Sequence, residues 1–133
     1  MPRTVLVVLV ALLSALALPS AGAARGGDGG DGGDVRATAS CGRGASAELR
    51  LKADDGAIKI ELRVRRARAG ERWSVSLVHE RRVAWRGTAR TSDAREGFRV
   101  RRTLPDYPGA DEISVRAASP RGLTCQATAT LRG

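Results

Sequence analysis

Basic side chains recur at alternate positions along several short segments of this 133-residue chain, and they offer the clearest binding chemistry. The chain has 23 lysines and arginines against 14 aspartates and glutamates. Guanidinium groups match the planar geometry of phosphate and carboxylate, which predicts an anion-binding surface. Charged strand exteriors are equally typical of an ordinary solvated face, so that interpretation stays open. The residues expected to bind anions are Arg50, Lys52, Lys59, Arg63, Arg65, Arg99 and Arg101.

The other reactive residues form no recognisable catalytic set. His79 is the single histidine, and its place beside Glu80 near a strand end favours a surface or turn residue over a catalytic group or metal ligand. No serine lies in a nucleophile-elbow context. Asp106, Asp111 and Glu112 fall in one loop and offer oxygen ligands to calcium, but their spacing matches no calcium loop and favours a turn. We expect no enzyme activity, no metal and no cofactor.

The beginning of the chain has the three-part layout of a secretion signal. Arg3 is followed by an apolar run at Val5–Leu18 and by the small residues Ala21, Gly22 and Ala23. The run is shorter than the roughly 20 residues that a membrane-spanning helix needs. We therefore predict a signal peptide over residues 1–24, no membrane span, and a secreted or cell-envelope protein.

Two cysteines, Cys41 and Cys125, stand near the two ends of the remaining chain. They are too few and too far apart for a zinc site, and an exported protein meets oxidising conditions. The sequence therefore predicts a Cys41–Cys125 disulfide.

The segment 25–34 is an arginine followed by three Gly-Gly-Asp triplets, which predicts a flexible linker. Residues 35–133 then form one domain with a modest core. Apolar residues in this domain recur with a period of two between turn signals, and no stretch has helical periodicity. We predict an all-β domain: an immunoglobulin-like or fibronectin-like antiparallel β-sandwich of about seven or eight strands with one disulfide.

The strand order follows if the strand holding Trp73 is the central tryptophan-bearing strand of such a sandwich. Residues 35–41 would then be an extra N-terminal strand beside the C-terminal strand, clipped to it by the disulfide. The other expected strands are a first hairpin at 47–53 and 57–66, a short strand from Val83 to Gly87, and three final strands at 97–104, 112–118 and 123–131.

This arrangement separates two outer faces. One sheet would expose the seven basic residues together with Glu48 and Glu61. Three of the four aromatic residues fall on inward positions, so no stacking platform accompanies the arginines and nucleic acid is not an expected partner. The aromatic residues are Trp73, Trp85, Phe98 and Tyr107. The other sheet would expose Ser74, Ser76, Thr88, Ser114, Thr124, Gln126, Thr128 and Thr130, with Arg86, Glu112 and Arg116 among them.

Several segments together resemble a group of short secreted immunoglobulin-like β-sandwich proteins from high-GC Gram-positive bacteria, whose function is unknown. The resemblance covers the whole predicted domain and implies a fold and export, but no activity. The strand at Ile58–Arg66 is acid-rich in that group and basic here, so no surface ligand is carried across. The matching segments are Cys41, Asp55-Gly56 before Ile58–Val64, Gly70-Glu71-Arg72-Trp73, Asp106, Gly109, Asp111 and Thr124-Cys125.

The sequence thus predicts an exported, non-enzymatic binding module. Its expected partner is an anionic polymer of the cell envelope or an acidic protein, bound through the basic sheet face. The alternative is a protein-binding adaptor that uses the Ser/Thr-rich face or the edge strands. A small hydrolase is disfavoured because no base–nucleophile pair is visible around His79.

Overall fold

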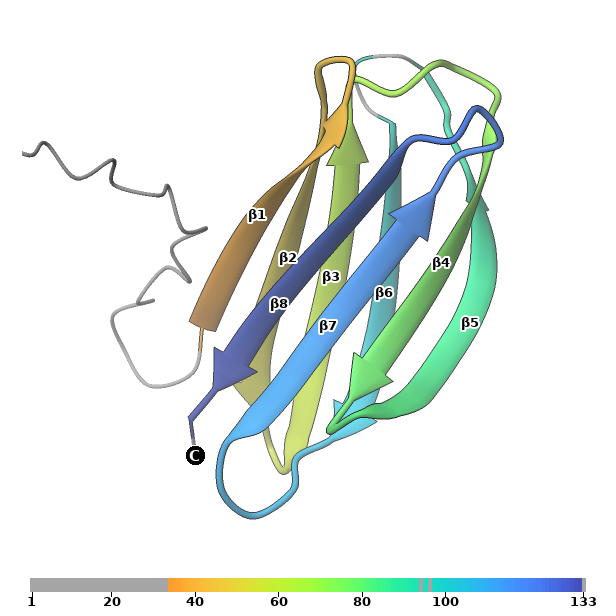
Figure 1. Ribbon diagram of the computed structural model, residues 1–133. Helices are drawn as coiled ribbons and strands as arrows, with labels where there is room; N and C mark the ends of the chain where they lie inside the picture. Colours follow the sequence, from red (N-terminus) through yellow and green to blue (C-terminus); the bar gives the residue numbers. More distant parts are fainter. Residues whose placement is uncertain (1–33, 94, 96, 133) are drawn as a thin grey trace, which may run out of the picture.

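The computed structural model describes residues 34–93, 95 and 97–132, which form eight β-strands (Figure 1). The predicted signal peptide and the predicted linker up to residue 33 lie outside the described residues. No helix within the described ranges is long and apolar enough to cross a membrane. The strands are β1 (Asp34–Gly42), β2 (Ala45–Asp54), β3 (Ala57–Arg65), β4 (Arg72–His79), β5 (Arg82–Arg90), β6 (Phe98–Pro105), β7 (Asp111–Ala118) and β8 (Thr124–Leu131).

The strands form two four-stranded antiparallel sheets packed face to face. One sheet has the strand order β1-β2-β3-β6, and the other has the order β5-β4-β7-β8. The predicted antiparallel sandwich with one disulfide is therefore confirmed, and β4, which carries Trp73, is an interior strand of its sheet. Strand β1 is an addition at the edge of the first sheet.

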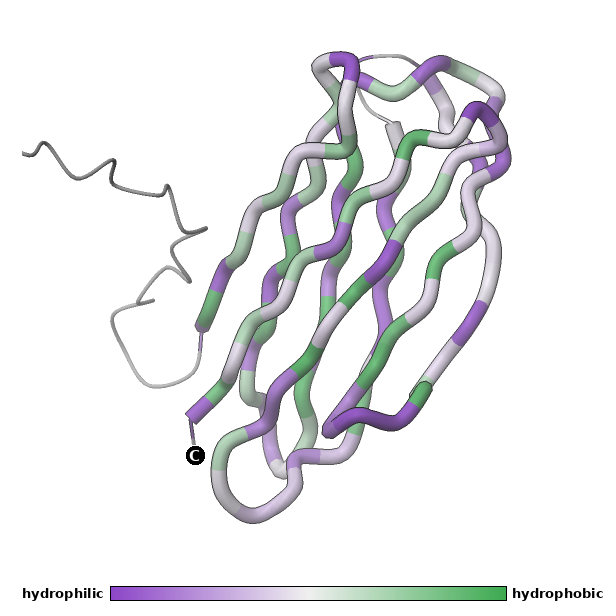
Figure 2. The backbone as a smooth tube through the Cα atoms, viewed as in Figure 1, coloured by the Kyte–Doolittle hydropathy of each residue, from purple (hydrophilic) through white to green (hydrophobic). Residues whose placement is uncertain are grey.

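Alternation of apolar and polar residues explains why these segments form half-buried strands (Figure 2). In β3, the residues Ile58, Ile60, Leu62 and Val64 are buried, whereas the residues between them are exposed or half-buried. The indole of Trp73 is fully buried, and its ring centroid lies 5.7 Å from that of Phe98. The hydrophobic core therefore lies between the sheets and leaves both outer faces to solvent.

Strand β1 lies beside β8 and is joined to it by the disulfide, as predicted, but it is not hydrogen-bonded to β8. It pairs along its length with β2, for example Val35 with Leu51, so it belongs to the sheet opposite β8. The cause is local: Arg43 and Gly44 both have positive φ values, 51° and 81°, which suits the tight turn of a hairpin. Strands joined by such a turn pair with each other, and this turn signal was missed in the sequence.

The predicted disulfide between Cys41 and Cys125 is confirmed and joins the two sheets where β1 and β8 meet. The two cysteines are 84 residues apart in the sequence. Closing a loop of that length lowers the chain entropy of the unfolded state, which corresponds to about 4–5 kcal/mol of stabilisation. The opposite long side of the sandwich, between β5 and β6, has no such link among the described residues.

Candidate functional site

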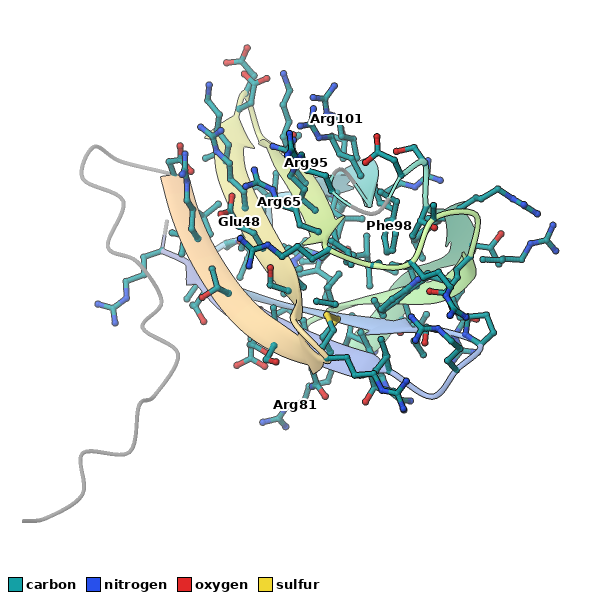
Figure 3. The ribbon with its side chains drawn as sticks, turned by 90° about the horizontal axis from the view of Figure 1, so that it is seen from above. Glu48, Arg65, Arg81, Arg95, Phe98 and Arg101 are labelled. Carbon is teal, nitrogen blue, oxygen red and sulfur yellow. A yellow bond between two sulfur atoms is a disulfide. The ribbon has the colours of Figure 1, made fainter. Side chains whose placement is uncertain are left out.

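Strand register brings the predicted basic residues together on the outer face of the β1-β2-β3-β6 sheet. Side chains that point outward from β2 lie opposite outward side chains of β3, which in turn lie opposite those of β6. Figure 3 shows Arg65 and Arg101 on the outer side of this sheet, while Phe98 lies between the sheets. We call this surface the basic face; its basic residues are Arg36, Arg50, Lys52, Lys59, Arg63, Arg65, Arg99 and Arg101.

Like charges stand directly opposite each other at several places on the basic face. Lys52 pairs with Lys59 across β2 and β3, and Arg63 pairs with Arg99 across β3 and β6. Arg36 of β1 also lies opposite Arg50 of β2. Directly opposed like charges destabilise an antiparallel sheet. The basic face therefore carries neighbouring positive charges that repel one another.

Acidic residues compensate part of this charge, mainly beside the ends of the strands. Asp34 accepts two hydrogen bonds from Arg50, the shorter being 2.7 Å, and these lower the pKa of the Asp34 carboxyl. Asp54 lies 2.7 Å from Nζ of Lys59, which lowers the pKa of Asp54 and raises that of Lys59.

Two acidic residues lie among the cations of the basic face: Glu48 is opposite Arg63, and Glu61 contacts two arginines. The carboxylate oxygens of Glu61 lie 3.5 Å from Arg99 and 3.1 Å from Arg101. Lys52 and Arg65 make no ion pair with any residue that the structure describes, so both remain available to an external anion.

A shallow recess of about 750 Å³ crosses the basic face. Two of the basic residues in this region were missed in the sequence. Arg36 was missed because β1 was not predicted to pair with β2, and Arg102 because it follows Arg101 directly and breaks the alternation of β6. The recess is lined by Arg50, Lys52, Lys59, Ile60, Glu61, Arg101, Arg102 and Thr103.

The outer face of the β5-β4-β7-β8 sheet has the expected hydroxyl-rich character. Ser114 and Thr128 are hydrogen-bonded across β7 and β8 at 2.7 Å. Arg116 lies between Ser76 and Gln126, so no second cation opposes it. One like-charged pair, Arg72 with Arg90, occurs at the end of this sheet.

His79 is buried, so its interpretation as a surface residue is wrong. Its Nε2 atom lies 2.6 Å from Oδ1 of Asp111, whose side chain is also buried. The ring of Tyr107 stacks on the imidazole with centroids 4.8 Å apart. A hydrogen bond to Asp111 raises the pKa of the adjacent Asp106. Asp111, expected as a turn residue of this loop, is therefore the buried hydrogen-bond partner of His79.

His79, Glu80 and Asp111 are the described residues best placed to hold a metal ion, because their donor atoms lie within 4.8 Å of one another. Two of these donors are already bonded to each other, and Oε1 of Glu80 accepts a 2.6 Å hydrogen bond from the backbone N–H of Glu112. A neighbouring pocket of about 490 Å³ has no serine, threonine or cysteine among its described lining residues, so His79 has no nucleophile beside it there.

Trp85 is less buried than its predicted inward position implies. It lies half-buried on edge strand β5, and Cζ of Arg102 lies 4.2 Å from the centroid of its ring. A cation at this distance from an aromatic face is attracted to it. Trp85 was placed from the sequence but Arg102 was missed, and with it this contact, which joins the two sheets across their β5 and β6 edges.

The chain matches no protein-family model, and a search of curated proteins finds no matching relative.

Proposed function

We propose that the protein is a non-enzymatic binding module that holds an anionic polymer of the cell envelope against its basic face. The observation that carries the proposal is the direct opposition of like charges, at Lys52–Lys59, Arg63–Arg99 and Arg36–Arg50. Like charges opposed in this way repel each other, and ion pairs with Asp34, Asp54 and Glu61 offset part of that repulsion. On the hydroxyl-rich face, by contrast, Arg116 lies between the uncharged Ser76 and Gln126, so the same fold does not require opposed cations.

A polymer suits this surface better than a small anion. Same-face residues along a strand are about 7 Å apart and neighbouring strands about 4.8 Å apart, so the cations form a grid over four strands. Repeated phosphate or carboxylate groups can contact several rows of this grid at once. The predicted export and the disulfide both favour an oxidising compartment outside the cytoplasm, where envelope polymers are found.

The test compares two charge-reversal variants with the same net charge. Lys52→Glu with Arg65→Glu changes the basic face at two residues that have no ion pair among the described residues. Arg116→Glu with Arg132→Glu makes the same change in net charge on β7 and just after β8. Binding to soluble polyglycerol phosphate is measured by calorimetry between 20 and about 300 mM salt.

We expect the first variant to bind at least about tenfold more weakly than the unchanged protein and with a shallower dependence on salt. The second variant should retain most of the affinity. Equal losses in the two variants would mean that net charge alone attracts the polymer, and they would contradict the proposal. Retention of full affinity by the first variant would contradict it as well.

A further inference from the structure

The side of the sandwich opposite the disulfide has two adjacent free sheet edges. Strand β5 is the outermost strand of one sheet, and β6 is the outermost strand of the other (Figure 1). Every residue of β5 is exposed or half-buried, and the strand runs for nine residues without a proline. An edge strand of this kind presents unpaired backbone N–H and C=O groups that can hydrogen-bond an additional strand.

A groove of about 450 Å³ runs between these two edges. Its apolar lining includes Trp85 and Ala89 from β5 and Phe98 and Val100 from β6. The Arg102 guanidinium covers the indole of Trp85 at 4.2 Å. Phe98 and Val100 are themselves buried, so apolar side chains of an added strand would pack mainly against the half-buried Trp85 and Ala89.

The rim of the groove is strongly basic. Arg90, Arg99, Arg101 and Arg102 all line the groove, and none of its described lining residues is acidic. Among the described residues, Glu61 compensates part of this charge, because its carboxylate contacts Arg99 and Arg101 from the basic face. An occupant that carries negative charge would thus be favoured over a neutral or basic one.

The arginines of β5 favour an acidic added strand over a second copy of β5. Arg82, Arg86 and Arg90 are all exposed on this edge strand. A second copy of the chain paired through β5 would bring these arginines close to one another, which is unfavourable. An acidic strand would instead meet them with opposite charge.

From these observations we propose that the β5–β6 edge binds an extended acidic segment of a partner protein, which adds to β5 as an antiparallel or parallel strand. Alternate apolar side chains of the segment fill the groove, and its carboxylates, on the other side of the added strand, contact exposed arginines of β5 such as Arg86 and Arg90. This site is separate from polymer binding on the basic face, although Arg99 and Arg101 border both surfaces.

The test uses the full chain and an eight-residue peptide of alternating glutamate and valine. Binding is measured by calorimetry and by the fluorescence of Trp85, with a Trp85→Phe variant to identify that signal. Arg82→Glu with Arg86→Glu should weaken binding at least tenfold. Lys52→Glu with Arg65→Glu, the variant that tests polymer binding, should leave peptide affinity within twofold.

Four further peptides distinguish strand addition from simple charge attraction. N-methylation of alternate peptide amides, made separately in each of the two registers, removes main-chain donors and should weaken binding at least tenfold in one register. A peptide of glutamate and glycine should bind more weakly because it cannot fill the groove. A peptide of lysine and valine should not bind.

Equal affinity of both N-methylated peptides and the unmodified peptide would overturn the proposal. So would dimerisation of the chain, detected by sedimentation and prevented by an excess of the peptide, because it would make a second copy the occupant. If the unchanged protein binds the peptide but does not bind polyglycerol phosphate, only the function proposed for the basic face is contradicted.

Discussion

The Nε2 atom of His79 lies 2.6 Å from Oδ1 of Asp111, although 32 positions separate the two residues in the sequence. The contact joins the end of β4 to the start of β7, and the backbone N–H of Tyr107 donates a second hydrogen bond to the same oxygen at 3.3 Å. Burial raises the pKa of the Asp111 carboxyl, but the hydrogen bonds from His79, Asp106 and Tyr107 outweigh burial and hold that pKa below its usual range.

We expect Asp111→Asn to lower the free energy of unfolding by about 1–3 kcal/mol at neutral pH, because a buried partner of His79 loses its charge. Asp55→Asn is a matched control, since Asp55 is exposed in a turn at a positive φ of 47° that asparagine also adopts. Urea denaturation of the two variants measures the difference. Equal stability of the two variants would contradict a stabilising role for the His79–Asp111 pair.

The ion pair between Glu71 and Arg121 predicts a loss of stability in acid. The hydrogen bonds from Arg121, the shorter at 2.7 Å, lower the pKa of Glu71 despite its burial. A carboxyl whose pKa is lower in the folded state stabilises the protein above its unfolded-state pKa, and this contribution is lost as pH falls through the folded-state pKa. As the pH is lowered below about 4.5, the melting temperature of Glu71→Gln should therefore fall less steeply than the melting temperature of the unchanged protein. Arg121→Gln should likewise make the melting temperature fall less steeply at acid pH. If both variants keep the slope of the unchanged protein, the Glu71–Arg121 ion pair is not the cause of the acid destabilisation.

Removing the disulfide should have a large effect on stability. Cys41→Ser with Cys125→Ser should lower the free energy of unfolding by about 2–5 kcal/mol, because the unfolded chain regains the freedom of an 84-residue separation. Reductant should destabilise the unchanged protein by a similar amount and leave the double variant unaffected. If the double variant is as stable as the oxidised protein, the disulfide contributes little.

Gly97 occupies a position that no other residue fits. Its φ is 61°, and a Cβ atom there would lie 1.9 Å from the carbonyl oxygen of Val64. Gly97→Ala should therefore destabilise the protein by more than the roughly 1–2 kcal/mol that left-handed backbone alone costs. Gly56→Ala is the control, because Gly56 has a φ of 74° and nothing within 4 Å of the added atom. Chemical denaturation should separate the two, and identical losses would mean that the close approach to Val64 relaxes freely.

The Trp85 indole occupies the space that a side chain at Gly87 would need, and this gives a spectroscopic prediction. A Cβ atom at Gly87 would lie 2.2 Å from the Trp85 ring, so Gly87→Ala must displace the indole from beneath Arg102. We expect a red-shifted tryptophan emission, since a displaced indole becomes more exposed. Thr88→Ala, on the opposite face of β5, should leave the spectrum unchanged. An unshifted spectrum for Gly87→Ala would show that the strand moves instead of the ring.

Local patterning was sufficient to predict the two faces of the sandwich. A strand places alternate residues on opposite sides, so the parity of Ile58 and Leu62 determined that Lys59 and Arg63 point outward once the core was identified. The pairing of the cysteines followed from their number and from the predicted export. These inferences depend on residues that are neighbours in sequence or have only one possible partner.

Contacts that depend on three-dimensional closure could not be predicted in the same way. The partner of His79 comes from another sheet strand, and nothing at Asp111 indicates which side chain it meets. Arg102 breaks the alternation of β6 because the outermost strand has no neighbour on one side to fix it, and its contact with Trp85 crosses from one sheet to the other. The first contact requires the pairing of β4 with β7 within one sheet, and the second requires the relative positions of the two sheets; periodicity contains neither.

The cross-link between Cys41 and Cys125 also sets an order of events during synthesis. Cys41 lies in the first strand and Cys125 in the last, so the six strands between them are synthesised before Cys125. The disulfide can therefore form only after nearly the whole domain has been synthesised. A chain whose synthesis stops before β8 retains Cys41 as a free thiol.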